Sequence, residues 1–313
     1  MPASTETEHI PLINKNLISV TVISAAYLLL SYFLIGYKPE QLVLVILFNT
    51  LYYLSKDTRR LILGFSIFII YWIIFDYMKA FPNYRYHAVD ISGIYFFEKS
   101  LFGIDYNGSV LTPNEFFKLR ANSAFDVLSG IFYLTWVPVP LLFAVYLFFK
   151  KRLYFFYFSL TFLLVNLLGF VIYYVHPAAP PWYVQNYGFQ FTAFTPGNTA
   201  GLARFDSFFG LSIFKSIYAK SSNVFAAMPS LHSSYPVIVL FYGLRSKLRY
   251  TNILFGVIML GIWFAAVYSS HHYIVDVLAG ILCAICSIGL FQLLLKYRRM
   301  NSFINHLMKI TSA

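Results

Sequence analysis

Charged residues are scarce in this sequence of 313 residues. They make up 11% of the chain, whereas 59% of the residues are hydrophobic and 20% are aromatic. Soluble domains average about 25% charged residues, because their surfaces must be largely polar. A soluble lipid-binding protein is the alternative, but it would need more polar surface than this composition supplies. The shortage of charge, together with long apolar runs, therefore predicts an integral membrane protein.

Cysteine is also nearly absent, and Cys283 and Cys286 lie three residues apart in one apolar run. That spacing disfavours a disulfide, and no metal-ligand pattern surrounds the pair. The polar segment 1–16 lacks the short apolar core of a cleavable signal. No motif for binding nucleic acid is present, so the formal net charge of +11 needs another explanation.

Apolar runs predict an all-α integral membrane protein with about eight transmembrane helices. The candidate spans are residues 17–35, 41–55, 61–78, 125–149, 153–175, 231–244, 252–269 and 272–295, of which the second and sixth are short. We expect a polar N-terminus (1–16), N-terminal spans with an outer interfacial segment (17–124), a catalytic helical core (125–296) and a C-terminal tail (297–313). Residues 94–101 are a candidate interfacial stretch.

The basic residues predict the orientation of these spans. If the N-terminus is cytoplasmic and the spans alternate, 14 of the 23 Lys and Arg residues face the cytoplasm with only 3 of the 12 acidic residues. The opposite side then carries no net charge. This asymmetry follows the positive-inside rule and predicts that both termini are cytoplasmic. The basic balance therefore reflects topology and contact with anionic lipid.

His272 and Asp276 open the last span and lie four residues apart, which places them on one face of a helix. A carboxylate at that position can accept the proton of one ring nitrogen. It thereby fixes the tautomer and leaves the other nitrogen free to attack an electrophile. The alternative is a pair that only helps two helices to pack.

His232 is the second histidine that we expect at the outer level of the membrane. Pro229 and Ser230 suit the first turn of a helix, so His232 lies near the start of the sixth span. The predicted topology puts His232 and His272 at the same depth, each at a helix N-terminus. Because two helix N-termini facing one cavity favour an anion, the pattern predicts a phosphate site between them.

Three motifs carry a resemblance to a known family. Pro229-Ser230-Leu231-His232 and His272-x3-Asp276 resemble the second and third motifs of the type 2 phosphatidic acid phosphatase superfamily. The leucine in place of that family's glycine, the His-His-Tyr-x-x-Asp sequence and the upstream run PAAPPWY at 177–183 resemble its inositol phosphorylceramide synthase branch. This branch comprises the aureobasidin-sensitive fungal enzymes and their bacterial relatives. The resemblance covers roughly residues 176–280.

The resemblance implies a phosphotransferase that needs no metal and no organic cofactor. His272 would attack phosphorus to form a phosphohistidine, Asp276 would orient it, and His232 would protonate the leaving alkoxide. The implied donor is phosphatidylinositol and the implied acceptor is ceramide, giving inositol phosphorylceramide and diacylglycerol. A lipid phosphatase acting on phosphatidate or an isoprenyl diphosphate is the main alternative. A transporter or scramblase would instead require polar residues through the middle of several spans.

The sequence departs from the superfamily in its phosphate-binding cations. The first motif, Lys-x6-Arg-Pro, is absent, and the arginine expected six residues before the nucleophile is Ala266. A transferring phosphoryl group still needs positive charge or hydrogen-bond donors around its oxygens. Arg204 is the first candidate for binding the phosphate. The alternative for each of these cations is that it lies on the protein surface and faces lipid headgroups. The other candidates are His271, Lys118, Arg120, Lys220 and the hydroxyl of Ser230.

Two further features of the sequence each allow two interpretations. Residues 177–183 follow the fifth span and form either a wall over the site or an aromatic anchor in the membrane interface, because proline cannot continue the helix. Asp126, at the start of the fourth span, either meets a headgroup hydroxyl or caps its helix, and we favour the cap.

Overall fold

The computed structural model describes residues 15–219 and 223–312. This part of the chain is α-helical apart from a few 3₁₀ turns and one two-stranded hairpin, as the composition predicts. It divides into two compact units, Met1–Leu63 and Gly64–Ala313. All the candidate site residues belong to the second unit.

The first unit contains α1 (Lys15–Ile35), α2 (Pro39–Leu54) and the beginning of α3 (Lys56–Tyr77). Pro39 occupies the first position of α2, where a backbone N–H would have no partner within the helix, so proline costs no hydrogen bond there. The Asn49 side chain donates to the Ser24 hydroxyl at 3.0 Å and links α2 to α1. Many large apolar side chains of α1 and α2 are exposed, as expected for helices that contact lipid.

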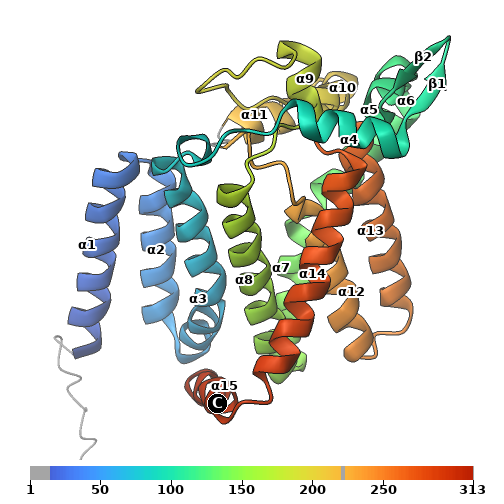
Figure 1. Ribbon diagram of the computed structural model, residues 1–313. Coiled ribbons are helices and arrows are strands. Elements are labelled where there is room, and N and C mark those ends of the chain that lie inside the picture. Colours follow the sequence, from blue (N-terminus) through green and yellow to red (C-terminus); the bar gives the residue numbers. More distant parts are fainter. Residues whose placement is uncertain (1–14, 220–222, 313) are drawn as a thin grey trace, which may run out of the picture. The chain divides into compact units, whose positions relative to one another are not determined.

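The second unit contains the rest of α3 and the elements that form the site (Figure 1). In chain order these are α4 (Ser92–Phe102), β1 (Ile104–Tyr106), β2 (Ser109–Leu111), α5 (Pro113–Leu119), α6 (Ser123–Leu134), α7 (Pro138–Lys150), α8 (Arg152–Val175), α9 (Pro181–Tyr187), α10 (Ala203–Phe209), α11 (Ile213–Ala219), α12 (Leu231–Arg245), α13 (Tyr250–Tyr268), α14 (Ile274–Leu294) and α15 (Arg298–Thr311).

Six segments of the described chain are long and apolar enough to cross a membrane. They are Leu17–Ile35, Lys56–Ala80, Ser123–Lys150, Arg152–Val175, Tyr250–Tyr268 and Ile274–Leu294. The two other predicted spans correspond to α2, which is a shorter apolar helix of 16 residues, and α12, which has 15. The protein therefore has multiple membrane-spanning helices, and the two predicted spans that are short in the sequence are also the two short helices.

The fourth predicted span is interrupted rather than continuous. The chain forms α6 and then α7, with a turn over residues 135–137 between them. Pro138 begins α7, and proline cannot donate to the preceding turn of a helix. The break brings Trp136 against the ring of His232, with the ring centroids 4.4 Å apart.

Helices α8, α12 and α14 pack against one another in the second unit (Figure 1). Close approach depends on glycine, because a Cβ on Gly280 of α14 would lie 2.2 Å from the carbonyl oxygen of Ser230 at the start of α12. Small residues at a helix crossing let two backbones approach in this way. The core beside this crossing consists of aromatic rings, such as Phe162 against Tyr235 at 4.5 Å between centroids.

The two ends of these helices differ in charge. Helices α12 and α14 begin near the histidines, and each ends beside a basic connection. Helix α8 runs in the opposite direction, so its basic first residues lie where α12 and α14 end (Figure 1). These connections contain the basic residues of 150–152, 245–249 and 296–299. The Arg152 guanidinium also hydrogen-bonds to the Thr311 carbonyl and ties α15 to the start of α8. The histidine cluster thus lies at the end opposite these three basic connections.

Two long connections cover the histidine end of the second unit. Helices α4 and α5 belong to the connection that follows α3, and α9, α10 and α11 to the one that follows α8 (Figure 1). Parallel bridges join Asp90 to Ala178 and Ala178 to Ala226, so the connections are hydrogen-bonded to one another. The predicted interfacial stretch is helical, and in α4 it exposes Phe96, Phe97 and Leu101 while burying Ile94, Tyr95 and Glu98.

Candidate active site

His272 lies in the turn between α13 and α14. The amides of His271 and His272 both donate to the Ala266 carbonyl, at 3.1 and 3.0 Å, and close the end of α13. Tyr273 is the N-cap of α14, so the helix begins two residues later than we predicted. His272 is therefore outside the helix, although the i, i+4 spacing still brings its ring near Asp276.

The ring of His272 is held by a backbone carbonyl. Its Nδ1 lies 3.0 Å from the Ala227 oxygen and 3.7 Å from Oδ2 of Asp276. Because a carbonyl only accepts, Nδ1 must carry the proton, and this leaves the lone pair on Nε2. The hydrogen-bond network thus assigns the tautomer in which Nε2 can act as a nucleophile.

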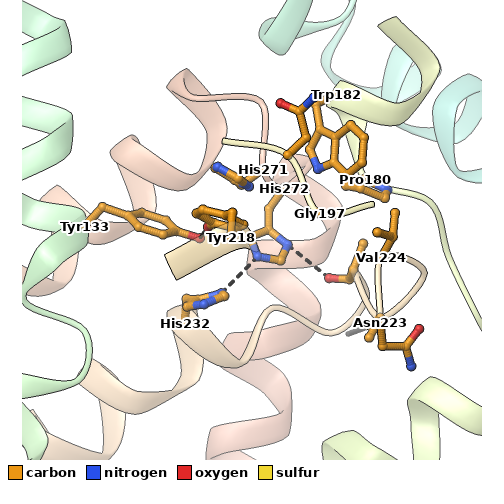
Figure 2. Close-up of a pocket in the computed structure, with 13 residues that line it drawn as sticks. Tyr133, Pro180, Trp182, Gly197, Tyr218, Asn223, Val224, His232, His271 and His272 are labelled. Carbon is orange, nitrogen blue, oxygen red and sulfur yellow. Dashed lines mark hydrogen bonds between the residues drawn. The ribbon is translucent and has the colours of Figure 1, made fainter. Parts of the chain in front are cut away.

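His232 lies directly opposite this lone pair. Nδ1 of His232 is 3.1 Å from Nε2 of His272, and the two rings face one another in Figure 2. Given the tautomer of His272, the His232 Nδ1–H is the donor of this hydrogen bond. The predicted meeting of the two histidines is therefore confirmed. Ser230 places His232 at the start of α12 by accepting a hydrogen bond from the Ser233 amide as the N-cap.

Asp276 is close to His272 but is not its hydrogen-bond acceptor. Its Oδ2 accepts from the Tyr273 amide at 2.8 Å, which caps α14. Its Oδ1 is buried and has no hydrogen-bond partner among the described residues. We predicted that this carboxylate accepts the ring proton of His272, and the structure gives that position to Ala227. What remains for Asp276 is a position beside the ring, with Oδ2 3.7 Å from Nδ1 of His272.

His271 also contributes to the site. Its Nε2 lies 3.0 Å from the Thr199 carbonyl, and its ring stacks on Tyr218 at 4.5 Å between centroids. Burial lowers the pKa of His271 to about 3 and the pKa of His272 to about 4, while the hydrogen bonds to Thr199 and Ala227 oppose these shifts. Both rings are consequently neutral at pH 7.

A pocket opens beside the three histidines. Tyr133 and Tyr218 line it with His271 on one side, and Pro180 and Trp182 line another (Figure 2). Trp182 is 5% exposed and Tyr183 is fully buried. Segment 177–183 therefore contributes to a wall of the pocket, and the alternative of an exposed aromatic anchor was wrong.

The predicted cations that lie among the described residues, Arg204, Lys118 and Arg120, do not line this pocket. Nε of Arg204 pairs with Oδ1 of Asp126 at 2.6 Å, and its guanidinium lies over the ring of Tyr268. Asp126 is therefore an ion-pair partner, and Asn122 is the N-cap of α6, so the cap that we favoured for Asp126 was wrong.

The remaining candidates lie elsewhere. Lys118 and Arg120 are exposed, Arg120 lies over the ring of Tyr106, and neither lines the pocket. Lys220 lies outside the described residues. Among the described residues predicted to bind phosphate, His271 is the one that lines the pocket, while Ser230 is buried in the cap of α12.

The N-terminus of α14 is not open to a phosphate. The Tyr273 amide donates to Asp276, and the Ile274 and Val275 amides donate to Oε1 and Oε2 of Glu98, each at 3.0 Å. Our expectation that this helix end would bind an anion was wrong, because protein carboxylates already occupy its amides. No cluster of three or more His, Cys, Asp or Glu side chains within 15–219 and 223–312 is placed to hold a metal ion.

Several functional groups escaped the sequence reasoning. The Ala227 carbonyl is a backbone group and carries no side-chain signal. Asn114 donates to the carbonyls of Val267 and His272, at 2.8 and 2.9 Å, and comes from a distant connection. Glu98 had a recognisable signal, because an acidic residue in the centre of the apolar run IYFFEKSLF is costly to bury without a partner.

With this geometry established, similarity to known proteins identifies the family. The sequence profile of the PAP2 superfamily matches residues 109–290. The chain belongs to the PAP2 superfamily. No solved structure matches this chain.

Its relatives in this superfamily include named lipid headgroup transferases. The chain is 48% identical over 294 residues to the phosphoinositol dihydroceramide synthase of Bacteroides thetaiotaomicron, covering 93% of this chain and 96% of that protein. It is 36% identical over 131 residues to the inositol phosphorylceramide synthase catalytic subunit of Saccharomyces cerevisiae, covering 41% of this chain and 31% of the yeast protein. The corresponding Schizosaccharomyces pombe subunit is 35% identical over 126 residues, covering 40% of this chain and 30% of that subunit. This PAP2 enzyme is thus a homologue of the inositol phosphorylceramide and dihydroceramide synthases.

Proposed function

We propose that this PAP2 enzyme moves a phosphoinositol headgroup from phosphatidylinositol to an acceptor of the ceramide class through a phosphohistidine on His272. The observation that carries the proposal is the 3.1 Å contact between Nε2 of His272 and Nδ1 of His232 inside the pocket. A nucleophile and a proton donor are thereby paired at one point. The name of the Bacteroides relative supports dihydroceramide as the acceptor.

In the first half-reaction, Nε2 of His272 attacks phosphorus and the bond from phosphorus to the diacylglycerol oxygen breaks. His232, protonated on both ring nitrogens once the anionic phosphate lies beside it, gives its Nδ1 proton to the departing oxygen and is left neutral. The two nitrogens must then stand about 6 Å apart, since the phosphorus and the leaving oxygen lie between them. The hydrogen bond between the rings therefore opens as the lipid phosphate enters.

In the second half-reaction, Nδ1 of His232 takes the proton of the primary hydroxyl of the ceramide. The hydroxyl oxygen attacks phosphorus and the bond from phosphorus to Nε2 of His272 breaks. The products are inositol phosphorylceramide and diacylglycerol, and both histidines return to their starting state. The His272 ring is positively charged as phosphohistidine. Asp276, 3.7 Å from Nδ1, stabilises that charge, and Ala227 keeps the Nδ1 proton in place.

The described residues that line the pocket carry no positive charge, and this supports a phosphodiester substrate. The lining residues Asn198, Asn223, Trp182 and Tyr218 offer hydrogen bonds without positive charge. A phosphodiester carries one negative charge, whereas a phosphomonoester carries nearly two at pH 7. Transfer between two lipids therefore suits this site better than hydrolysis of phosphatidate.

We further propose that the active site faces away from the cytoplasm. In the second unit, the histidines lie at the opposite helix ends from the basic connections at 150–152, 245–249 and 296–299. The positive-inside rule assigns that basic end to the cytoplasm. The C-terminal helix α15 would lie on the same side, in contact with anionic lipid.

Reconstituted protein and labelled phosphatidylinositol test the proposal. We expect a new inositol phosphorylceramide when ceramide or dihydroceramide is present, in amounts equal to the diacylglycerol released. Without an acceptor, we expect labelled protein in which the label is acid-labile, as a phosphohistidine requires. Release of inorganic phosphate from phosphatidate, with no new sphingolipid from phosphatidylinositol, would instead establish a lipid phosphatase.

A further inference from the structure

Glu98 is a carboxylate that the proposed reaction leaves without a role. It is 0% exposed, although it lies on the amphipathic helix α4, whose other face exposes Phe96, Phe97 and Leu101. Burying a carboxylate is costly unless hydrogen bonds replace its water. Glu98 precedes residues 109–290, which the PAP2 profile covers, so the profile assigns it no function.

The partners of Glu98 are the first amides of α14. Oε1 accepts from Ile274 and Oε2 from Val275, each at 3.0 Å. Both oxygens are acceptors, which is the pattern of an ionised carboxylate at a helix N-terminus. Burial and the nearby charge of Asp276 raise the pKa of Glu98, and the two amides oppose that shift.

These two amides flank the reactive groups along the chain. Ile274 follows His272 by two residues, and Val275 immediately precedes Asp276. The other side of the same turn is held by Asn114, whose amide donates to the His272 carbonyl at 2.9 Å. The backbone on both sides of the His272 ring is therefore fixed by side chains from the connection between α3 and α6.

We propose that Glu98 is a positioning residue for the nucleophile. Its carboxylate fixes the first turn of α14 and so sets the distances from His272 to His232 and to Asp276. The inference rests on the proposed function, because that function makes His272 the nucleophile. Displacing a reacting atom by about 1 Å can cost about 100-fold in rate, so a small shift of this turn is enough to matter.

Glu98→Gln is the variant that tests the role most cleanly. Glutamine has the same shape but only one acceptor oxygen, so its NH₂ group faces one of the two backbone N–H groups. We expect kcat for headgroup transfer to fall about 10- to 100-fold with KM unchanged. Glu98→Asp keeps the charge and one hydrogen bond, and we expect it to recover part of the lost kcat.

Asp206 provides a matched control in the same unit. It is 6% exposed and accepts from the Phe214 and Lys215 amides at 3.2 and 3.0 Å, so it caps α11 as Glu98 caps α14. Asp206→Asn makes the same chemical change at a helix that neither bears His232 nor directly follows His272. We expect this variant to keep its kcat. Tyr218 lies on α11 and lines the pocket, so any effect of the lost cap on substrate binding should appear in KM.

Hydrogen exchange followed by mass spectrometry supplies a readout that does not depend on activity. In Glu98→Gln, we expect faster exchange in peptides that contain Ile274 and Val275, and unchanged exchange in α8 and α12. Faster local exchange with a lower kcat supports the proposal. An unchanged kcat overturns it, and so does a loss of kcat that accompanies faster exchange throughout the unit, because that is a general loss of stability.

The wild-type assay separates this inference from the proposed function. If the wild type transfers no phosphoinositol, the proposed function fails. Glu98 can then still be tested by comparing Glu98→Gln with the wild type. The two quantities compared are the hydrogen exchange at Ile274 and Val275 and the rate of the reaction that the wild type performs through His272. If the wild type transfers phosphoinositol and Glu98→Gln matches it, the role of Glu98 alone is overturned.

Discussion

The carbonyl oxygen of Ala227 lies 3.0 Å from Nδ1 of His272, closer than any oxygen of Asp276. In the familiar Ser-His-Asp arrangement a carboxylate holds the histidine tautomer, and replacing it by an amide costs about 10⁴-fold in rate. A backbone carbonyl performs that task here. In the proposed reaction the carboxylate then has only the weaker task of stabilising charge, and this distinction can be measured.

Asp276→Asn should therefore reduce transfer without abolishing it. The variant keeps the Ala227 hydrogen bond and loses the negative charge beside the ring, so we expect kcat to fall by about 10- to 100-fold. Steady-state kinetics of wild type and variant in the same lipid mixture provide the measurement. A loss as complete as that of His272→Ala would show that Asp276 is the true acceptor of the ring proton.

His272→Ala should remove the reaction. Without Nε2 no phosphohistidine can form, and we expect the rate of transfer to fall by about 10³-fold or more. His87→Ala is the control, because His87 is exposed and outside the pocket. Headgroup transfer and acid-labile labelling are measured on both variants, and a His272→Ala protein that still becomes labelled contradicts the assignment.

Gly280→Ala tests whether the spacing of α12 and α14 sets the spacing of the two histidines. A Cβ at this position meets the Ser230 carbonyl at 2.2 Å, so one backbone must move, at a cost of about 1–3 kcal/mol in stability. We expect kcat to fall more than the melting temperature explains. Gly289→Ala on the same helix is the control, since no atom lies within 4 Å of its Cβ. Equal kinetics for the two variants would contradict the coupling.

Arg204→Gln should affect stability more than catalysis. Arg204 pairs with Asp126, and its side chain is 32% exposed, so solvent screening limits the coupling to about 1 kcal/mol. A double-mutant cycle with Asp126→Asn, followed by thermal unfolding, measures this value. Arg120→Gln is the control on an exposed arginine. A large increase in KM for phosphatidylinositol in Arg204→Gln would instead make Arg204 a phosphate ligand.

The pH dependence of kcat/KM should reflect the buried histidines. Burial lowers the pKa of His272 to about 4, so the free enzyme keeps its nucleophile neutral as the pH falls from 7 to 5. We expect the acidic limb below pH 6, and a limb centred on pH 6.5 would contradict the burial of His272. Stability should decrease over the same range, because the unfolded chain takes up protons near pH 6.5 that the folded rings exclude.

Much of the fold and the pairing of His232 with His272 could be predicted. Apolar runs mark membrane helices because the bilayer imposes their length, and Ser230 marks a helix start because its side chain accepts an orphan amide. The break before Pro138 was also readable in principle, since proline ends the hydrogen-bond ladder of the preceding turn. The reaction proposed for the two histidines remains a prediction.

The chain by itself determined the long apolar helices, and that His232 lies in the first turn of one helix and His272 just before the start of another, because hydrophobic length and capping are local properties. Only the tertiary structure decided that Ala227 holds the His272 ring, that Glu98 and Asn114 hold its turn, and that Arg204 is paired with Asp126. The partners in these contacts lie 45 to 177 positions apart along the chain. In some of them one partner is a backbone carbonyl, a group that every residue has. No local pattern encodes such partners, so they exist only once the helices and their connections have packed.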